Sequence, residues 1–280
     1  MTAARALGRW AGGDRVAAAS VAVLLLLGGG SALVPMISPH SYDAQRLEET
    51  FQGPSRAHWL GTDHLGRDVL TRLAYGGRIS FLISGTAVLA HTLIGLVTGL
   101  AAGGIGGRTD AVLMRLTDVF LAFPPLLFLI LLTGLLGPRI PYIVLALSLV
   151  GWAGMARQLR AEALGLRARD FVVAARALGA TSSRILGRHV LANVVTLAAV
   201  RASLDVGPVI LSESTLSFLG IGVQPPLPSW GLMIADGFAH LRTHPRLTLY
   251  PSAVLSVAIL VLTFVGESLA EALDPRTRPR

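Results

Sequence analysis

Six apolar stretches, separated by polar and charged segments, dominate the pattern of this 280-residue chain. A helix needs about 20 apolar residues to cross the roughly 30 Å hydrocarbon core of a bilayer. It also bonds its own backbone polar groups internally, as lipid requires. The pattern therefore predicts an all-α polytopic membrane protein with about six transmembrane helices. The apolar stretches are Val16–Tyr42, Ile79–Gly107, Val119–Pro138, Ile140–Ala156, Val190–Ser212 and Leu247–Gly266.

Two polar segments interrupt this pattern. The first contains turn sequences such as Gly53-Pro54, and the second is rich in arginine. The predicted organisation is an N-terminal segment 1–15, a first transmembrane helix 16–37, a polar segment 38–78, a five-helix core 79–272 containing a loop 157–189, and a tail 273–280.

The first apolar stretch has two interpretations. Arg5, Arg9 and Arg15 precede it, as basic residues precede the core of a signal peptide. The run continues to Met36, however, which is longer than a usual signal core. An uncleaved membrane anchor is therefore favoured.

The distribution of arginine predicts the orientation of the chain. With the N-terminus inside, the inner segments hold 15 arginines and the outer segments 8, and Arg201 lies within a span. Because positive charge concentrates on the cytoplasmic side, both termini and the loop 157–189 are predicted to be cytoplasmic. The bias is moderate, since the outer segment is long and long loops weigh less in this rule.

The composition supports a membrane protein and excludes several kinds of site. Only 14% of the residues are charged, against about 25% in soluble domains. The net charge of +8 could indicate a nucleic-acid partner, but inner loops of membrane proteins need these arginines anyway. The chain has neither Cys nor Lys, which excludes thiolate chemistry, a Lys Schiff base and a phosphate-binding loop with its Lys. We expect no catalytic residue, cofactor or metal, and ATP would have to bind to another chain.

The loop 157–189 is the clearest candidate for a functional element. Phe171–Leu178 favours a short helix, and Gly179 suits its C-terminus, where glycine adopts a positive φ at no cost. Thr181 or Ser182 could cap a second helix that leads into the fifth span. The small side chains of Ala174, Ala175 and Ala177 would leave a shallow surface for a partner. An amphipathic helix at the lipid headgroups is an equally good interpretation of these residues alone.

These residues carry a family resemblance. The sequence Ala174-Ala175, followed after three residues by Gly179, resembles the "EAA" loop of ABC importer permeases. Four further segments resemble dipeptide and oligopeptide permeases in the same order along the chain: His58–Asp68 with Arg72, Tyr75-Gly76 and Arg78; Gly106–Asp110 with Met114-Arg115, Thr117-Asp118 and Phe123-Pro124; Leu216–Pro226 with Pro228 and Trp230-Gly231; and Leu273–Arg276.

The resemblance implies the type I permease fold and the C-type subunit of the dipeptide/oligopeptide/nickel family. Such a subunit forms half of a translocation pathway in the cell membrane of a prokaryote. Its implied partners are a second permease subunit, two ABC ATPase subunits, an extracytoplasmic binding protein and membrane lipid, with no nucleic acid. Related subunits carry dipeptides, oligopeptides, glutathione, nickel chelates or some sugars, and no residue here distinguishes among them.

The resemblance also implies which residues contact an ATPase. In the family this loop forms a coupling helix, which corresponds here to Phe171, Ala174, Ala175, Ala177, Leu178 and Gly179. Two positions depart from the family pattern. The usual Glu of the loop is Val173, and the usual Pro after it is Ala192. The missing Glu removes a charge that could contact the ATPase.

Polar residues within the spans are further candidates. Arg201 and Asp205 are four residues apart, so a helix places them close enough to pair. They could line a pathway and contact a zwitterionic peptide, but a structural ion pair is favoured. Glu213 could face a cavity mouth or mark the water interface. His91 is interpreted as a hydrogen-bonded packing residue rather than a ligand.

Two segments outside the spans complete the expectations. Asp63, Arg67, Asp68 and Arg72 alternate in sign at helical spacing, and a solvated helix with an Asp68–Arg72 pair is favoured. The loop Phe218–Trp230 is rich in Gly and Pro, so we expect it to be irregular.

Two other functions compete with an importer permease. An intramembrane enzyme would need a metal-binding, nucleophile or paired-aspartate motif, and the sequence offers none. A stand-alone secondary transporter or channel would be supported by inverted repeats, which are not evident. The permease is therefore the favoured function and the stand-alone transporter the alternative.

Overall fold

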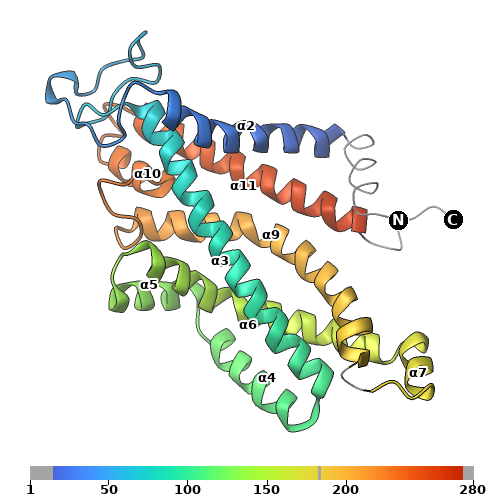
Figure 1. Ribbon diagram of the computed structural model, residues 1–280. Coiled ribbons are helices and arrows are strands. Elements are labelled where there is room, and N and C mark those ends of the chain that lie inside the picture. The colour runs from blue at the N-terminus through green and yellow to red at the C-terminus, as the bar shows by residue number, and fades with distance from the viewer. Residues whose placement is uncertain (1–14, 182–183, 274–280) are drawn as a thin grey trace.

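The structure, a computed structural model, describes residues 15–181 and 184–273, and its described residues form helices joined by loops (Figure 1). Within these residues there is no strand, only an isolated antiparallel bridge between Thr62 and Asp68. The expected N-terminal segment before Arg15, Ser182 and the tail beyond Leu273 lie outside the described residues. The elements are α2 (Arg15–Ile37), η1 (Leu47–Glu49), α3 (Val69–Ile105), α4 (Gly107–Ala122), α5 (Pro125–Leu136), α6 (Ile140–Arg167), α7 (Asp170–Ala177), the π-helical η2 (Ile185–Val190), α9 (Leu191–Phe218), α10 (Trp230–Phe238) and α11 (Arg246–Leu273).

Five helical segments of the described chain are long and apolar enough to cross a membrane: α2, α3, α6, η2 with α9, and α11. The pair α4 and α5 makes a sixth crossing if the two helices count as one bent span. The predicted all-α fold with several membrane spans is therefore confirmed.

The third predicted span, Val119–Pro138, is wrong as a single straight helix. The axes of α4 and α5, which together cover this stretch, are bent by 88° relative to each other. Phe123 is extended, with φ −83° and ψ 138°, because the residue before a proline is disfavoured in the α conformation. Pro125 then begins α5, where its fixed φ and missing N–H do no harm.

The fourth span is longer than its apolar run. Helix α6 continues through Arg167, so residues 157–167, which the charges assigned to the loop, are helical. Helix α3 is longer still, with 37 residues, or about 55 Å at 1.5 Å per residue. Both helices therefore extend beyond the hydrocarbon core.

Helices α3 and α6 pack closely through small residues. A β-carbon added at Gly95 would lie 2.5 Å from Met155 Cγ, and one at Gly99 would lie 2.7 Å from the carbonyl oxygen of Ala156. A β-carbon added at Gly103 would lie 2.8 Å from the β-carbon of Ala163. In lipid, helices associate by packing rather than by a hydrophobic driving force, and glycines every four residues let two backbones meet.

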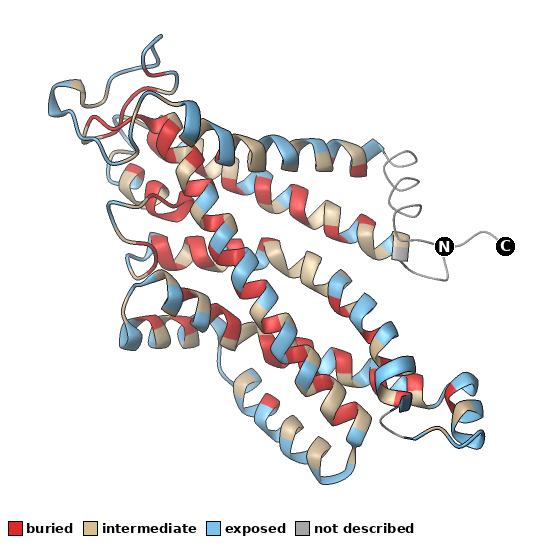
Figure 2. Cartoon of the chain, in the orientation of Figure 1, coloured by how far each residue is buried: buried red, intermediate tan, exposed pale blue. Residues whose placement is uncertain are grey.

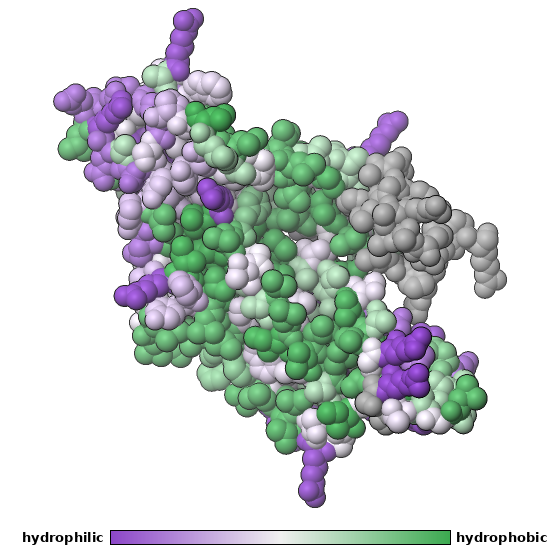
Figure 3. All heavy atoms as spheres, in the orientation of Figure 1, coloured by the Kyte–Doolittle hydropathy of each residue, from purple (hydrophilic) through white to green (hydrophobic). Residues whose placement is uncertain are grey.

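The surface divides into polar ends and an apolar middle. Figure 3 shows hydrophilic residues gathered at one end, over residues 38–68, and beside α7 at the other, with a hydrophobic surface between them. Buried residues concentrate where α3 faces its neighbours (Figure 2), and parts of the loops 38–68 and 219–229 are buried as well. We call residues 38–68, the loop 219–229 and α10 the polar cap.

The polar cap contains a buried ionic cluster, so the expected solvated helix is wrong. Asp63 Oδ2 lies 2.7 Å from Arg67 Nε and 3.5 Å from Arg72 Nε. Asp236 of α10 lies 3.5 Å from Arg67 and 4.0 Å from Arg72. Arg72 is only 1% exposed, because residues 38–68 fold back over the start of α3.

Asp68 does not form the expected side-chain pair with Arg72. It is instead the N-cap of α3, and its Oδ2 accepts a hydrogen bond from the Thr71 backbone N–H at 2.8 Å. Its Oδ1 lies 2.9 Å from His58 Nδ1. Beside the cluster, burial lowers the pKa of His64 below its ordinary value, although Asp63 and Asp236 act in the opposite direction.

We expect Gly99→Ala to lower the midpoint of thermal unfolding in detergent. Its methyl group would meet the α6 backbone, and such overpacking costs about 1–3 kcal/mol. Gly85→Ala on the same helix is the matched control, since its β-carbon would meet nothing within 4 Å. The control should gain up to about 1 kcal/mol from helix propensity. Equal midpoints for the two variants would contradict close packing of α3 on α6.

We expect Asp63→Asn to destabilise the protein by about 3–5 kcal/mol, because it leaves buried arginines without a partner. The control is Asp118→Asn, which breaks a pair with Arg157 whose side chains are about half exposed. Exposed pairs contribute about 0–1 kcal/mol. Unfolding midpoints measured in one detergent compare the variants, and a loss no larger than that of the control would argue against the buried cluster.

Candidate functional site

The loop between α6 and α9 folds as a short helix that ends in a glycine turn. Helix α7 covers Asp170–Ala177, and Gly179 has φ +83°. The Ala180 N–H donates to the Ala175 carbonyl at 3.0 Å, and the Gly179 N–H donates to the Arg176 carbonyl at 3.0 Å. These two bonds define a Schellman motif, the ending that glycine favours. Thr181 then accepts a hydrogen bond from the Arg184 N–H.

The predicted contact residues lie mostly on the surface of this loop. Phe171, Ala174, Ala177, Leu178 and Gly179 are exposed, and Ala175 is half-buried. The side chain of Leu178 is the most extreme, at 89% exposure. Val173, which takes the place of the family's Glu, is exposed as well. The short helix therefore presents an apolar surface beyond the end of the helical bundle.

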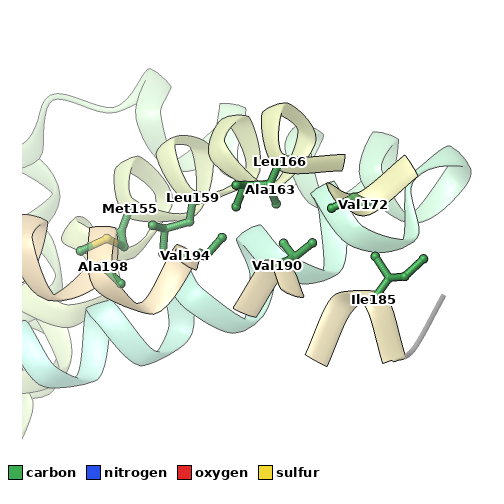
Figure 4. Packing of buried hydrophobic residues seen from close by; sticks show 9 residues of the cluster. All are labelled: Met155, Leu159, Ala163, Leu166, Val172, Ile185, Val190, Val194 and Ala198. Carbon is green, nitrogen blue, oxygen red and sulfur yellow. The ribbon is translucent and has the colours of Figure 1, made fainter. Parts of the chain in front are cut away.

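A buried cluster anchors the other side of α7 (Figure 4). Val172 is fully buried and packs with residues of α6, η2 and α9. The sequence analysis did not single out Val172, because Phe171 and Val173 beside it are apolar as well and no pattern in the sequence separates the buried residue from the exposed ones. The buried members of this cluster are Met155, Leu159, Ala163, Leu166, Val172, Ile185, Val190, Val194 and Ala198.

Ion pairs hold α6 to its neighbours near this loop. Arg160 binds both carboxylate oxygens of Asp110 on α4, one of them at 2.6 Å, and Arg157 binds Asp118. Arg167 Nη1 donates to the Gly103 carbonyl at the end of α3 at 2.9 Å. Both aspartates lie in segments that carried the family resemblance, but the sequence alone indicated no partner for either.

Arg201 and Asp205 do pair, and the structure adds a third group. Arg201 Nη2 lies 2.9 Å from Asp205 Oδ1. Asp205 Oδ2 lies 3.3 Å from Nε2 of His91 on α3. The His91 ring is buried against Gly151, where a β-carbon would lie 2.4 Å from its Nδ1. The expectation of a packing residue fits this position, but within the described residues neither ring nitrogen has a hydrogen-bond partner, so the expected hydrogen bond is not formed. The sequence did not indicate the carboxylate beside the ring.

Glu213 faces neither a cavity mouth nor the water interface, so both interpretations are wrong. Its side chain is fully buried between α3 and α9. Ser80 Oγ donates to Oε2 and Ser217 Oγ donates to Oε1, each at 2.8 Å. These serine hydroxyls satisfy the carboxyl inside the protein and join the two helices.

A group of possible metal ligands in the polar cap is engaged by the protein itself. His40, His58 and Asp68 bring their ligand atoms within 4.8 Å of one another. However, the two imidazole rings stack at 4.5 Å, and His40 Nε2 lies 2.9 Å from the Ala57 carbonyl. Stacked rings aim their nitrogen lone pairs side by side rather than at a common point, which does not suit an ion.

Comparison with known proteins identifies the family. Residues 95–279 match the family described as "Binding-protein-dependent transport system inner membrane component". The chain is 40% identical to the dipeptide transport system permease protein DppC of Bacillus subtilis over 266 residues, which is 95% of this chain and 83% of the relative. It is 40% identical to the oligopeptide transport system permease protein OppC of Escherichia coli over 267 residues, or 95% and 88% of the two chains. The OppC protein of Bacillus subtilis is 36% identical over 265 residues, or 95% and 87%. The chain therefore belongs to the binding-protein-dependent transport system inner membrane components.

Proposed function

We propose that this chain is the C-type permease subunit of an ATP-driven importer of dipeptides or oligopeptides. The relatives that cover 95% of the chain are described as dipeptide and oligopeptide permeases. The observation that carries the mechanism is the loop around α7. Its outer face is apolar and exposed, whereas Val172 on its inner face belongs to the buried cluster that α6, η2 and α9 also form.

The loop is suited to transmit movement from an ATPase subunit. A partner that buried Leu178 would gain about 1.5–3 kcal/mol. Movement of α7 would then pass through the Val172 cluster to α6 and α9, since packed interiors transmit displacement. The pairs of Arg157 and Arg160 with α4 would carry it further into the bundle. In this proposal the chain itself binds no ATP and catalyses no reaction.

The proposed assembly needs four kinds of partner. Two ABC ATPase subunits would contact the loops of two permease subunits, because five or six spans supply only half of a pathway. An extracytoplasmic binding protein would deliver the peptide at the polar cap, and lipid would cover the hydrophobic middle. This arrangement places α7 and both termini in the cytoplasm of a prokaryotic cell, as the arginine distribution predicts.

Reconstitution of the importer with its partner subunits in proteoliposomes tests this function. Peptide uptake should require ATP and the binding protein. Leu178→Ala should weaken binding of the ATPase subunit about tenfold or more, since 1.4 kcal/mol corresponds to a factor of ten. Unfolding of the isolated subunit should not change, because Leu178 is exposed.

Ile105→Ala is the control, since Ile105 is another exposed aliphatic residue, at the end of α3. Equal ATPase binding by the two variants would contradict docking at Leu178. Peptide flux through this chain alone, driven by an ion gradient, would favour the stand-alone transporter instead.

We expect Gly179→Val to reduce the number of peptides transported per ATP hydrolysed. A non-glycine residue at φ +83° is strained by about 1–2 kcal/mol, and this strain would change the direction in which α7 presents its apolar face. Gly179→Asn is the control, because Asn tolerates the left-handed region better. Measured transport and ATPase rates give the ratio, and a valine variant as well coupled as the asparagine variant would rule out a role for the turn.

A further inference from the structure

Helix α9 carries a line of polar positions at helical spacing. Arg201, Asp205, Pro208, Ser212 and Thr215 follow one another at intervals of four, three, four and three residues, so they share one face of the helix. Pro208 is exposed, and the other four are half-buried. We call these five residues the polar stripe.

The polar stripe also presents a backbone hydrogen-bond acceptor. The Pro208 nitrogen carries no hydrogen, so it cannot bond to the carbonyl of Leu204 one turn earlier, which leaves an acceptor on this face. Ser212 Oγ and Thr215 Oγ1 donate to the carbonyls of Pro208 and Leu211 at 2.9 and 2.8 Å. Their oxygen lone pairs remain available to water or to a ligand.

Another exposed part of α9 is mostly apolar. Val195 and Ala199 are exposed and lie away from the stripe around the helix. The side of α9 away from the stripe exposes Val195 and Ala199 together with Thr196, whereas the stripe carries an ion pair and two hydroxyls, with the exposed Leu211 beside it. Lipid suits the apolar residues, whereas polar groups at membrane depth face a water-filled cavity or another protein group.

Contacts with Asp205 position the guanidinium of Arg201 on the polar stripe. One oxygen of Asp205 pairs with it and the other lies against the buried His91, so α3 supports the carboxylate that positions the guanidinium. The Arg201 side chain is still 42% exposed. Among the described residues, Asp205 is its only ion-pair partner. A guanidinium has five N–H donors in a planar fork that fits a second carboxylate.

We propose that the polar stripe lines the translocation pathway and that Arg201 receives the C-terminal carboxylate of a passing peptide. This rests on the proposed importer function and names the part of the substrate that the permease itself contacts. The hydroxyls of Ser212 and Thr215 and the Leu204 carbonyl provide polar groups along the same face for the peptide backbone. The ion pair with Asp205 keeps the stripe close to neutral, so the peptide can leave as well as bind.

Cysteine labelling in the assembled, reconstituted importer tests whether the polar stripe is exposed to water. The chain has no cysteine, so each substitution introduces a single thiol into this subunit, and an unsubstituted importer gives the background. Ser212→Cys and Thr215→Cys should react with the charged reagent methanethiosulfonate ethylsulfonate at least tenfold faster than Ala199→Cys or Val195→Cys. Equal rates at the two faces would overturn the inference, because they would place the stripe in lipid or in a dry contact between subunits.

Transport by Arg201 variants tests the carboxylate. Arg201→Gln should slow ATP-driven uptake of a dipeptide with a free C-terminus at least fivefold, and Arg201→Lys should restore most of it. Uptake of the C-terminally amidated dipeptide should be the same in the unsubstituted importer and in the Arg201→Gln variant. A fold loss as large for the amidated peptide as for the free one, or no rescue by lysine, would show a structural role and overturn the inference.

The unsubstituted importer separates this inference from the function on which it rests. If it takes up the dipeptide with ATP but the stripe behaves like the side that exposes Val195 and Ala199, only the pathway assignment fails. If it shows no ATP-dependent uptake with its partner subunits, the proposed function fails first.

Discussion

The close contact between α3 and α6 is the constraint on which the rest of the structure depends. Gly95, Gly99 and Gly103 bring the backbones together where any larger side chain would collide. Because lipid supplies no hydrophobic force between helices, such fitted surfaces decide which helices pair. Helix α3 then carries Ser80 and His91, which lie against Glu213 and Asp205 of α9, and α6 leads directly into α7.

This pairing explains how the polar cap and the α7 loop are connected. The first turn of α3 lies in the cap, where Asp68 caps it and Arg72 enters the ionic cluster. Its last turn accepts the hydrogen bond from Arg167, next to α7. A helix about 55 Å long thus spans from one polar end to the other. Displacement of α7 therefore has a continuous packed route to the cap.

The sequence predicted well the features that depend on local pattern. Apolar length predicted the spans, and the requirement for positive φ predicted the turn at Gly179, whose Schellman bonds the structure shows. It failed where distant segments meet. Alternating charges at Asp63, Arg67 and Arg72 are as typical of a solvated helix as of a buried cluster. Only the fold brings Asp236 to them and covers them.

The same limit applied within the membrane. The i,i+4 spacing of Arg201 and Asp205 is local, so their pairing could be predicted, whereas the contact with His91 spans more than 100 residues. The bend between α4 and α5 is an intermediate case. Phe123-Pro124-Pro125 signals a helix end, but the apolar run continues through it and hides the change in direction.

The buried polar residues separate into two kinds by how completely the protein satisfies them. Glu213 is enclosed, and two serine hydroxyls at 2.8 Å bind its two oxygens. Such a group ties helices together and has no capacity for a ligand. Arg201 has one carboxylate for a five-donor fork and keeps 42% of its side chain exposed. Since an unsatisfied charge in a bilayer is costly, its remaining donors need water or a transient partner. A subunit that moves peptides offers both, which is why the incomplete site, rather than the complete one, is where function is expected.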